Sequence, residues 1–290
     1  MHGSPQLQAV WTSERRRMAR WSPRSRRRLA LALPRLKRAL RPALHRLCSH
    51  RKGCGGVKGA VRRIQRSLPR ARYVARFDVA AYYNSIRHDK MLELLEQAGV
   101  GEEDLSLVGD YVALPDTRGT GKGLTASGSL SPLLGALYLS PLDHAMGARM
   151  KRGQLVCYVR YMDDFVLLAR SRWQLRRAIA ALHEVIAGLG LRLHRVKRFI
   201  GRTTRGFDFL GYRIRAGARL RPSAEGLRRL RERARRLYER EGDWHRLRQY
   251  VLRWQRWHWG GLDGLVSRRG GARRSWHHVC THLAGKHPPG

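Results

Sequence analysis

The sequence predicts an α+β fold in which an antiparallel sheet packs against helices and a helical segment follows. Two short apolar runs, residues 155–159 and 165–168, are rich in strand-forming residues and bounded by polar ones. The residues between these runs are few enough for a tight turn, so the two strands should form a hairpin. Farther along the chain, apolar residues recur at helical spacing between residues 227 and 257, which predicts helices there.

Three patterns predict the elements that precede this hairpin. Residues 1–48 are basic, and a helix is expected over residues 29–47, where a stripe of leucines is interrupted by two prolines. The apolar run 73–77 predicts a strand. A helix is expected to begin near His88, because the apolar residues that follow recur at helical spacing.

A helical segment is expected over residues 216–265. Ser223 is placed to cap its first helix, and Glu241-Gly242-Asp243 interrupt the pattern before a second helix. Residues 266–290 are rich in Gly, Arg and His and are expected to form a basic, poorly ordered tail. The chain is thereby divided into four segments, residues 1–48, 49–215, 216–265 and 266–290.

Three aspartates are the candidate catalytic residues. Asp163 and Asp164 stand together in the hairpin turn, where their mutual repulsion favours a bound cation or hydrogen-bond donors. Asp78 follows the predicted strand 73–77, and the three carboxylates converge if that strand lies beside the hairpin. Such a set could hold two Mg²⁺ ions about 3.5–4 Å apart, the arrangement that supports in-line displacement at phosphorus. For Asp163 and Asp164 taken alone, a solvated turn is the alternative.

An ordered series of motifs over about residues 49–215 resembles the reverse transcriptase family. The matching segments are Arg51-Lys52-Gly53-Cys54-Gly55-Gly56 in the fingers, Phe77-Asp78 with Tyr82-Tyr83 in motif A, residues 123–134 in motif B, Tyr161-Met162-Asp163-Asp164 in motif C, residues 189–197 in motif D and residues 207–212 in the primer-grip motif E. Each motif alone is weak to moderate evidence, whereas the ordered set is strong. The resemblance is greatest to the enzymes of group II introns and diversity-generating retroelements, which the sequence does not separate.

This resemblance implies a right-hand polymerase palm with abbreviated fingers and a helical thumb. It also implies that Asp78, Asp163 and Asp164 bind two Mg²⁺ ions, for which Mn²⁺ can substitute. Val79 belongs to the same implied metal-binding set. Lys197 would protonate the leaving pyrophosphate, although a solvated surface position is the alternative for this residue.

The resemblance further implies a nucleotide site and a primer grip. Tyr83 stands five residues after Asp78, at the steric-gate position where a ring excludes a ribose 2′-hydroxyl; packing in the core is the alternative. The other residues of the implied nucleotide site are Phe77, Val79, Ala126, Arg51 and Lys52, of which the last two would contact triphosphate or template. The implied primer grip consists of Phe209, Leu210, Gly211 and Tyr212.

Two departures from the family pattern bear on activity. Motif B usually reads Pro-Gln-Gly where this chain has Thr125-Ala126-Ser127, so no amide stands near the nascent base pair. Diversity-generating enzymes also lack this Gln, and the family association predicts error-prone copying. The basic strand pair that normally precedes Arg51 and grips the triphosphate is not recognisable, so truncated fingers are expected.

The charge balance favours a nucleic-acid partner. The chain has 60 Lys and Arg residues against 21 Asp and Glu, for a net charge of +39. Such a field attracts polyanions, and non-specific affinity should fall steeply as salt rises. A basic binding module would carry this charge too, so charge alone does not imply an enzyme.

Cysteine usage and hydropathy indicate a cytoplasmic protein that does not enter a membrane. The bacterial origin is what the family resemblance implies. The four cysteines are Cys48, Cys54, Cys157 and Cys280. They lack paired zinc spacing and are expected to be reduced thiols. No apolar run reaches the roughly 18 residues of a membrane span.

Aromatic and metal-capable residues near the C-terminus have two interpretations each. Trp254, Trp257 and Trp259 stand among basic residues, and packing in the thumb core is favoured over stacking on nucleotides. Metal-capable side chains gather at His277, His278, Cys280 and His282. No second ligand pair accompanies them, so a zinc site is the less favoured interpretation.

The predicted function is RNA-directed DNA synthesis, a nucleotidyl transfer, for a bacterial retroelement. The expected partners are an RNA template, a DNA or RNA primer, deoxynucleoside triphosphates, a cognate structured RNA and, as a further option, an accessory protein. The alternative is a catalytically impaired relative that serves as an RNA-binding scaffold. The altered motif B and truncated fingers favour this alternative, whereas the aspartates and Tyr83 favour the polymerase.

Overall fold

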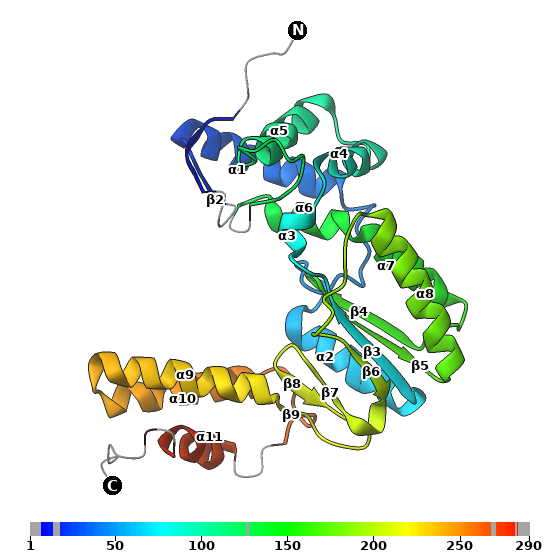
Figure 1. Cartoon of the computed structure of the whole chain (residues 1–290). Coiled ribbons are helices and arrows are strands. Elements are labelled where there is room, and N and C mark those ends of the chain that lie inside the picture. The colour runs from blue at the N-terminus through cyan, green and yellow to red at the C-terminus, as the bar shows by residue number, and fades with distance from the viewer. Residues whose placement is uncertain (1–6, 14–17, 126–127, 268–270, 282, 284–290) are drawn as a thin grey trace.

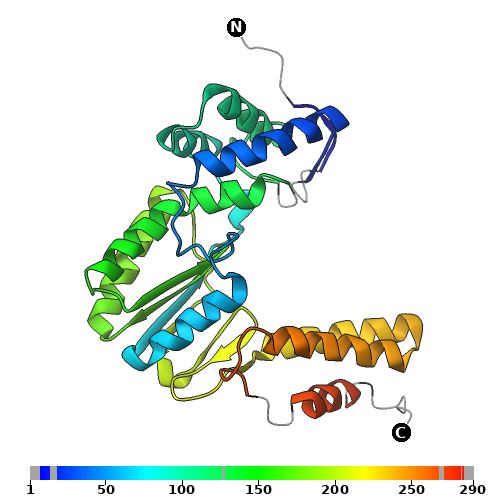
Figure 2. The same ribbon diagram turned by 180° about the vertical axis from the view of Figure 1, so that it is seen from behind.

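The computed structural model describes residues 7–13, 18–125, 128–267, 271–281 and 283 of the chain. Its elements follow an arc (Figure 1). Helices of the N-terminal half lie at one end, a sheet flanked by helices lies in the middle, and two long helices project at the other end, as the reverse view in Figure 2 also shows. The predicted α+β architecture, an antiparallel sheet with packed helices, is confirmed.

The central sheet contains four antiparallel strands in the order β4-β5-β3-β6. The strands are β3 (Tyr73–Asp78), β4 (Cys157–Tyr161), β5 (Asp164–Ala169) and β6 (Phe199–Arg202). β4 and β5 form the predicted hairpin, and β3 lies beside β5 with Asp78 opposite Asp164. The sheet therefore brings the end of β3 and the hairpin turn to the same place.

Alternate side chains of this sheet enter two different cores. Phe77 and Phe165 face a core covered by α7 and α8, whereas Val166 faces a core covered by α2. These helices are α2 (Gly56–Ser67), α7 (Ser140–Lys151) and α8 (Arg172–Gly188). Because both faces are covered there, β4 and β5 are buried almost continuously rather than at alternate residues.

The N-terminal part is mostly helical. Its helices are α1 (Pro23–Ala39), α3 (Tyr82–Ser85), α4 (His88–Gln97), α5 (Glu102–Ala113) and α6 (Ser131–Tyr138). Helix α4 begins at His88 as predicted. The helix expected over residues 29–47 begins earlier, after the capping Ser22, and ends ahead of Pro42, since a proline disfavours helical conformation in the residue before it.

A strand pair precedes α1, although no such pair is recognisable in the sequence ahead of Arg51; whether it contacts a triphosphate stays a prediction. β1 (Ala9–Ser13) pairs with β2 (Met18–Trp21) in antiparallel register. Both strands are short and give no apolar periodicity, so the sequence pattern did not reveal them. Residues 14–17, which connect them, lie outside the described residues.

A small antiparallel sheet follows β6. Its strands, in the order β7-β8-β9, are β7 (Phe207–Phe209), β8 (Tyr212–Ile214) and β9 (Arg221–Pro222). The β7–β8 turn consists of Leu210 and Gly211, whose φ angles are 49° and 85°. Two-residue hairpin turns require this left-handed backbone and favour glycine there.

Two long helices, α9 (Ala224–Glu241) and α10 (Trp244–Trp259), form where the helical segment 216–265 is predicted, and they are called the thumb below after the role that the resemblance implies. The Ser223 hydroxyl accepts a hydrogen bond from the Gly226 amide at 3.0 Å, as the predicted cap requires. Left-handed Gly242 ends α9, and the Asp243 side chain caps α10. The break at residues 241–243 is therefore confirmed.

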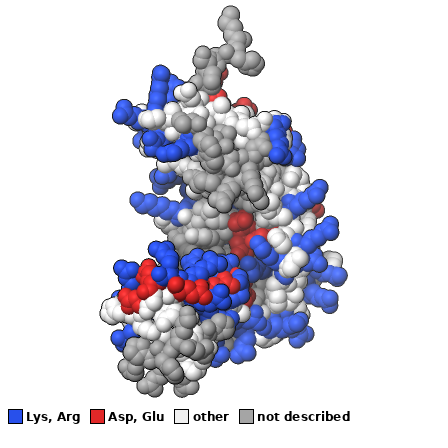
Figure 3. All heavy atoms as spheres, turned by 60° about the vertical axis from the view of Figure 1, so that its left-hand side comes forward, with Lys and Arg blue, Asp and Glu red and all other residues white. Residues whose placement is uncertain are grey.

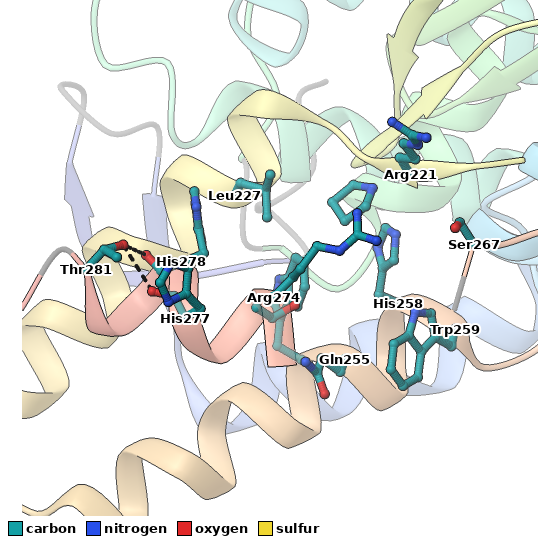
Figure 4. A pocket seen from close by; sticks show the side chains of 13 residues that line it. Arg221, Leu227, Gln255, His258, Trp259, Ser267, Arg274, His277, His278 and Thr281 are labelled. Carbon is teal, nitrogen blue, oxygen red and sulfur yellow. Dashed lines mark hydrogen bonds between the residues drawn. The ribbon is translucent and has the colours of Figure 1, made fainter. Parts of the chain in front are cut away.

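A third helix, α11 (Gly271–Cys280), forms within the segment 266–290 that is expected to be a poorly ordered tail; residues 268–270, 282 and 284–290 of that segment lie outside the described residues. It packs against α9 and α10, and its Val279 joins Leu230 and Leu247 in the thumb core. The Gly-, Arg- and His-rich composition obscured this amphipathic face. Between α10, α11 and β9 lies a cavity of about 400 Å³ (Figure 4), lined on the α10 side by Trp254 and His258.

The metal-capable residues of this segment form no site within the described part of the chain. His277 and His278 lie on α11 beside the cavity (Figure 4), and their carbonyls accept hydrogen bonds from the Thr281 hydroxyl at 3.0 and 3.4 Å. His282 lies outside the described residues. Among the described residues, no three His, Cys, Asp or Glu side chains are grouped closely enough to hold a metal ion.

The three tryptophans of α10 have different surroundings. Trp254 packs against the thumb core, as favoured from the sequence. Trp259 packs instead against the core beneath α2. Trp257 is 51% exposed, and its ring centroid lies 6.3 Å from that of Tyr212.

Lys58 of α2 joins the palm to the end of α10. Its ammonium donates hydrogen bonds to the carbonyls of Trp257 and His258 and to the Tyr212 hydroxyl. It also lies 5.1 Å and 4.3 Å from the ring centroids of Tyr212 and Trp257. Burial lowers the pKa of Lys58 to about 8.

His258 should make stability depend on pH. Its ring lies between those of Tyr212 and Trp254, with centroids at 4.3 and 5.3 Å. Burial, aided by Lys58, lowers the pKa of His258 from 6.5 to about 4. Below about pH 6.5, His258 binds a proton in the unfolded chain, whereas in the folded chain it stays neutral down to about pH 4. The free energy of unfolding should therefore fall as the pH is lowered from about 6.5 to about 4.

The variant His258→Phe keeps a stacked ring but cannot titrate. Between pH 7 and pH 5, its free energy of unfolding should fall less than that of the wild type by about 1 kcal/mol. Urea unfolding at the two pH values measures this difference. Equal losses in both proteins would contradict the assignment of a neutral His258.

No helix in the described ranges is long and apolar enough to cross a membrane. None of the four cysteines is in a disulfide, and Cys48 and Cys157 are buried.

Candidate active site

A groove runs from the end of β3 to the thumb. Its volume is about 660 Å³. Its lining includes Arg76, Asp78, Asp164 and Lys197 of the palm, Leu210 and Gly211 of the β7–β8 turn, and Arg229 and Trp257 of the thumb. In Figure 3, acidic side chains gather in a hollow at the centre of the face shown, and basic side chains are spread around it.

Two of the three predicted aspartates, Asp78 and Asp164, line one end of this groove, and Asp163 lies next to them in the hairpin turn. Asp78 is opposite Asp164 in the β3–β5 register, and the Val79 amide donates to the Asp163 carbonyl at 3.2 Å. Burial raises the pKa of Asp163, and the charges of Asp78 and Asp164 raise it further. The three aspartates are therefore near enough to repel one another, a repulsion that a cation would relieve, but their side chains are not grouped closely enough to form a three-carboxylate metal site.

The hairpin turn that presents Asp163 is held by two side chains from outside it. Met162 has φ of 57°, which is uncommon for a residue with a side chain of this size. The Met162 amide donates to His50 Nδ1 at 3.1 Å, and the Met162 carbonyl accepts from the Arg160 guanidinium at 2.9 Å. Both polar groups of the Met162 backbone are thus bound.

Arg160 is itself wholly buried and paired with Asp143 of α7. The side chains of both residues have 0% exposure, and the guanidinium reaches the carboxylate at 2.8 and 2.5 Å. Arg160 also donates to the Ala136 carbonyl of α6 at 3.1 Å. This one side chain therefore connects α6, α7 and the hairpin turn.

Arg76 and Lys197 compensate part of the acidic charge. Arg76 donates to both carboxylate oxygens of Asp164, at 3.0 and 3.1 Å. Burial still raises the pKa of Asp164, and Arg76 opposes this effect. Lys197, which is largely exposed, has its ammonium 3.7 Å from Asp78.

The donor set fits a divalent cation at Asp78 and Asp163. Carboxylate oxygens are the ligands that Mg²⁺ prefers, and the raised pKa of Asp163 reflects burial beside like charges. Asp164 differs, because both of its oxygens are bound by Arg76 and would have to leave this partner to bind a metal. Asp78 and Asp163 would therefore be the first ligands.

Tyr83 lies beside these acids, whereas two other predicted nucleotide-site residues have buried side chains. Burial, with Asp163 as a neighbour, raises the pKa of Tyr83 to about 12, so its hydroxyl stays protonated. Phe77 is buried against Phe165 and His183, and Val79 is buried as well. Ala126 lies outside the described residues.

Arg51 and Lys52 lie away from the acidic groove. They line a separate hollow of about 440 Å³ together with Lys37 and Arg41. Arg51 donates to the Leu44 carbonyl at 2.7 Å, which fixes the loop that follows α1. The structure therefore brings these cations to each other rather than to Asp78.

Two of the predicted primer-grip residues form a turn, and the other two are buried beside it. Leu210 and Gly211 form the β7–β8 turn and line the groove that contains Asp78. Phe209 and Tyr212 are buried under this turn. The Tyr212 hydroxyl donates to the His258 carbonyl at 2.6 Å, which connects the turn to α10.

Sequence reasoning missed three residues that shape the site: His50, Asp143 and Arg160. A charged residue directly after an apolar strand run, as at Arg160, could have signalled a buried ion pair. His50 and Asp143 carry no such local signal, because their partners lie far along the chain.

Comparison with known proteins agrees with this geometry. A family model described as "Reverse transcriptase (RNA-dependent DNA polymerase)" matches residues 15–214. No curated protein sequence matches the chain. This match covers most of the chain, so the protein belongs to the reverse transcriptase family.

Solved telomerase structures share its fold. Apo telomerase from Candida tropicalis aligns with a TM-score of 0.53 and 12% identity, covering 90% of this chain and 50% of that one. Telomerase from Candida albicans, in complex with a TWJ fragment of telomeric RNA, aligns with a TM-score of 0.50 and 11% identity, covering 89% and 54%. The chain thus spans about half the length of these telomerases.

Proposed function

We propose that this protein is an RNA-directed DNA polymerase of a bacterial retroelement. Membership of the reverse transcriptase family supports the class of reaction. The observation that carries the proposal is that Asp163 lies beside Asp78, which lines a groove that continues to the Leu210–Gly211 turn and to α9 and α10. A primer terminus held at that turn would reach the acids.

Each group of the site has a role in this proposal. Two divalent ions, when bound at Asp78, Val79 and Asp163 with Asp164 as a further ligand, would lower the pKa of the primer hydroxyl and stabilise the leaving pyrophosphate. Lys197 stands 3.7 Å from Asp78 and could give a proton to the pyrophosphate. The excess of basic residues would hold an RNA template, a primer and a cognate structured RNA through their phosphates.

A primer-extension assay tests this function. The full chain is incubated with a defined RNA template, a DNA primer, deoxynucleotides and Mg²⁺, and the products are sequenced. Extension supports the polymerase, and frequent substitutions in the products would support the error-prone copying suggested by Ala126. Binding without extension would instead support the RNA-binding scaffold, which the Arg76–Asp164 pair favours because it occupies one of the expected metal ligands.

Replacing Tyr83 by Ala should weaken selection against ribonucleotides by about 10-fold or more. The half-buried ring packs near α6, where a Cβ added at Gly135 would lie 3.2 Å from it, and removal of the ring opens space beside the incoming sugar. The ratio of deoxynucleotide to ribonucleotide incorporation is the quantity to measure. Tyr83→Phe keeps the ring and should keep the ratio; an unchanged ratio in an active Tyr83→Ala would assign Tyr83 to the core.

A further inference from the structure

We propose that His50 is a positioning residue that fixes the turn presenting Asp163 and connects it to the start of α6. This inference rests on the proposed polymerase function for its kinetic consequence, but the contact itself can be tested without activity. His50 does not touch Asp78 or Asp163 in this arrangement; it acts through the backbone of Met162.

The Met162 backbone needs external partners because of its conformation. A left-handed residue leaves the regular hydrogen-bond pattern of the two flanking strands, so its amide and carbonyl must find other groups. The Arg160 guanidinium donates a hydrogen bond to the Met162 carbonyl, and the Met162 amide donates one to His50 Nδ1 at 3.1 Å. The His50 and Tyr161 rings also meet edge to face, with centroids 5.9 Å apart.

The chemistry of His50 suits an acceptor at Nδ1. Burial, with the neighbouring Arg160 charge, lowers the pKa of His50 to about 4, so the ring is neutral near pH 7. The Nε2 atom lies 3.5 Å from the Pro132 carbonyl, which only an N–H can contact favourably. This places the proton on Nε2 and leaves Nδ1 to accept.

The backbone around His50 is attached to the same hairpin. The Ser49 amide donates to the Arg160 carbonyl at 2.8 Å, and the Arg160 amide donates to the Leu47 carbonyl at 3.3 Å. Residues 47–50 therefore run beside β4, and the imidazole bridges from this segment to Pro132 at the first turn of α6. A shift of α6 would change the position of Asp163 through His50 and Arg160.

Two variants of His50 distinguish the effect of the hydrogen bond from that of ring packing. His50→Phe keeps the ring volume but cannot accept a bond, and His50→Asn offers an oxygen close to the position of Nδ1. His144→Phe is the control, because His144 is an exposed histidine that bonds only a carbonyl, that of Ala43, away from the turn. His50→Leu replaces His50→Phe if the larger ring prevents folding, as judged by circular dichroism.

Hydrogen exchange measured by mass spectrometry on peptides that cover residues 158–166 tests the contact directly. The turn should exchange about 10-fold faster in His50→Phe and at a near wild-type rate in His50→Asn and His144→Phe. The rate constant for single-nucleotide addition should fall about 10- to 100-fold in His50→Phe, with primer–template affinity unchanged, and recover in His50→Asn.

The outcomes are distinguishable. Unchanged exchange in His50→Phe, or in His50→Leu where it replaces His50→Phe, would overturn the proposal. An equal loss of rate in His50→Asn and His50→Phe would also overturn it, since packing alone would then explain the effect. A wild type that does not extend primers would remove the proposed function, while the exchange result would still decide whether His50 holds the turn.

Discussion

Asp163→Asn and Asp78→Asn are each expected to lower the rate of primer extension by about 1000-fold or more. Asp164 is paired with Arg76, whereas Asp163 lies beside the charges of Asp78 and Asp164, a repulsion that a divalent ion would relieve. Loss of one ligand removes several kcal/mol of stabilisation from the reacting phosphate, and each 1.36 kcal/mol corresponds to about 10-fold in rate. Extension rates on a defined RNA template at saturating deoxynucleotide measure the loss.

RNA affinity should change little in the same variants, because duplex binding depends mainly on contacts between basic side chains and phosphates. Asp89→Asn is the matched control, since Asp89 is an exposed aspartate of α4 that pairs only locally, with Arg87. It should extend primers like the wild type. Normal extension by Asp163→Asn would remove these acids from the chemistry, and a parallel loss of RNA binding would indicate misfolding instead.

The second large effect should come from the buried pair of Arg160 and Asp143. Asp143→Leu would leave a guanidinium with no counter-charge in a site of 0% exposure. Removing one partner of a buried ion pair typically costs about 3–5 kcal/mol, because the remaining charge stays desolvated. Urea unfolding should show a decrease of that size in the free energy of unfolding.

A double-variant cycle distinguishes the ion pair from simple packing. Asp143→Leu combined with Arg160→Met removes both charges, so the loss should be smaller than the sum of the two single losses by about 2 kcal/mol or more. Some loss should remain, because the Met162 and Ala136 carbonyls no longer receive hydrogen bonds. Arg35→Met, at an exposed pair with Asp104, should change the free energy of unfolding much less than either single replacement in the buried pair. Additive losses at Asp143 and Arg160 would contradict a coupled pair.

Much of the sheet could be predicted from sequence because its signals are local. The apolar runs around the Tyr161–Asp164 turn define a hairpin, and the run before Asp78 defines a third strand. The thumb helices carry an ordinary serine cap and a glycine stop, which short-range rules identify. These features depend on residues within a few positions of each other.

The missed features depend on contacts between distant segments. His50 meets Met162 across 112 residues and Arg76 meets Asp164 across 88, and no local pattern encodes such pairs. The β1–β2 pair is too short to show a period, and α11 has a composition more typical of a tail. In each case tertiary packing, rather than local propensity, determines the outcome.

The contacts of Lys58 have a mechanical consequence for this molecule. A hinge requires a few backbone positions whose dihedral angles can change freely. At the base of α10, however, the carbonyls of Trp257 and His258 are bound by Lys58, and the neighbouring Arg62 donates to the Gly261 carbonyl. We therefore expect the backbone at this end of α10 to be stiff.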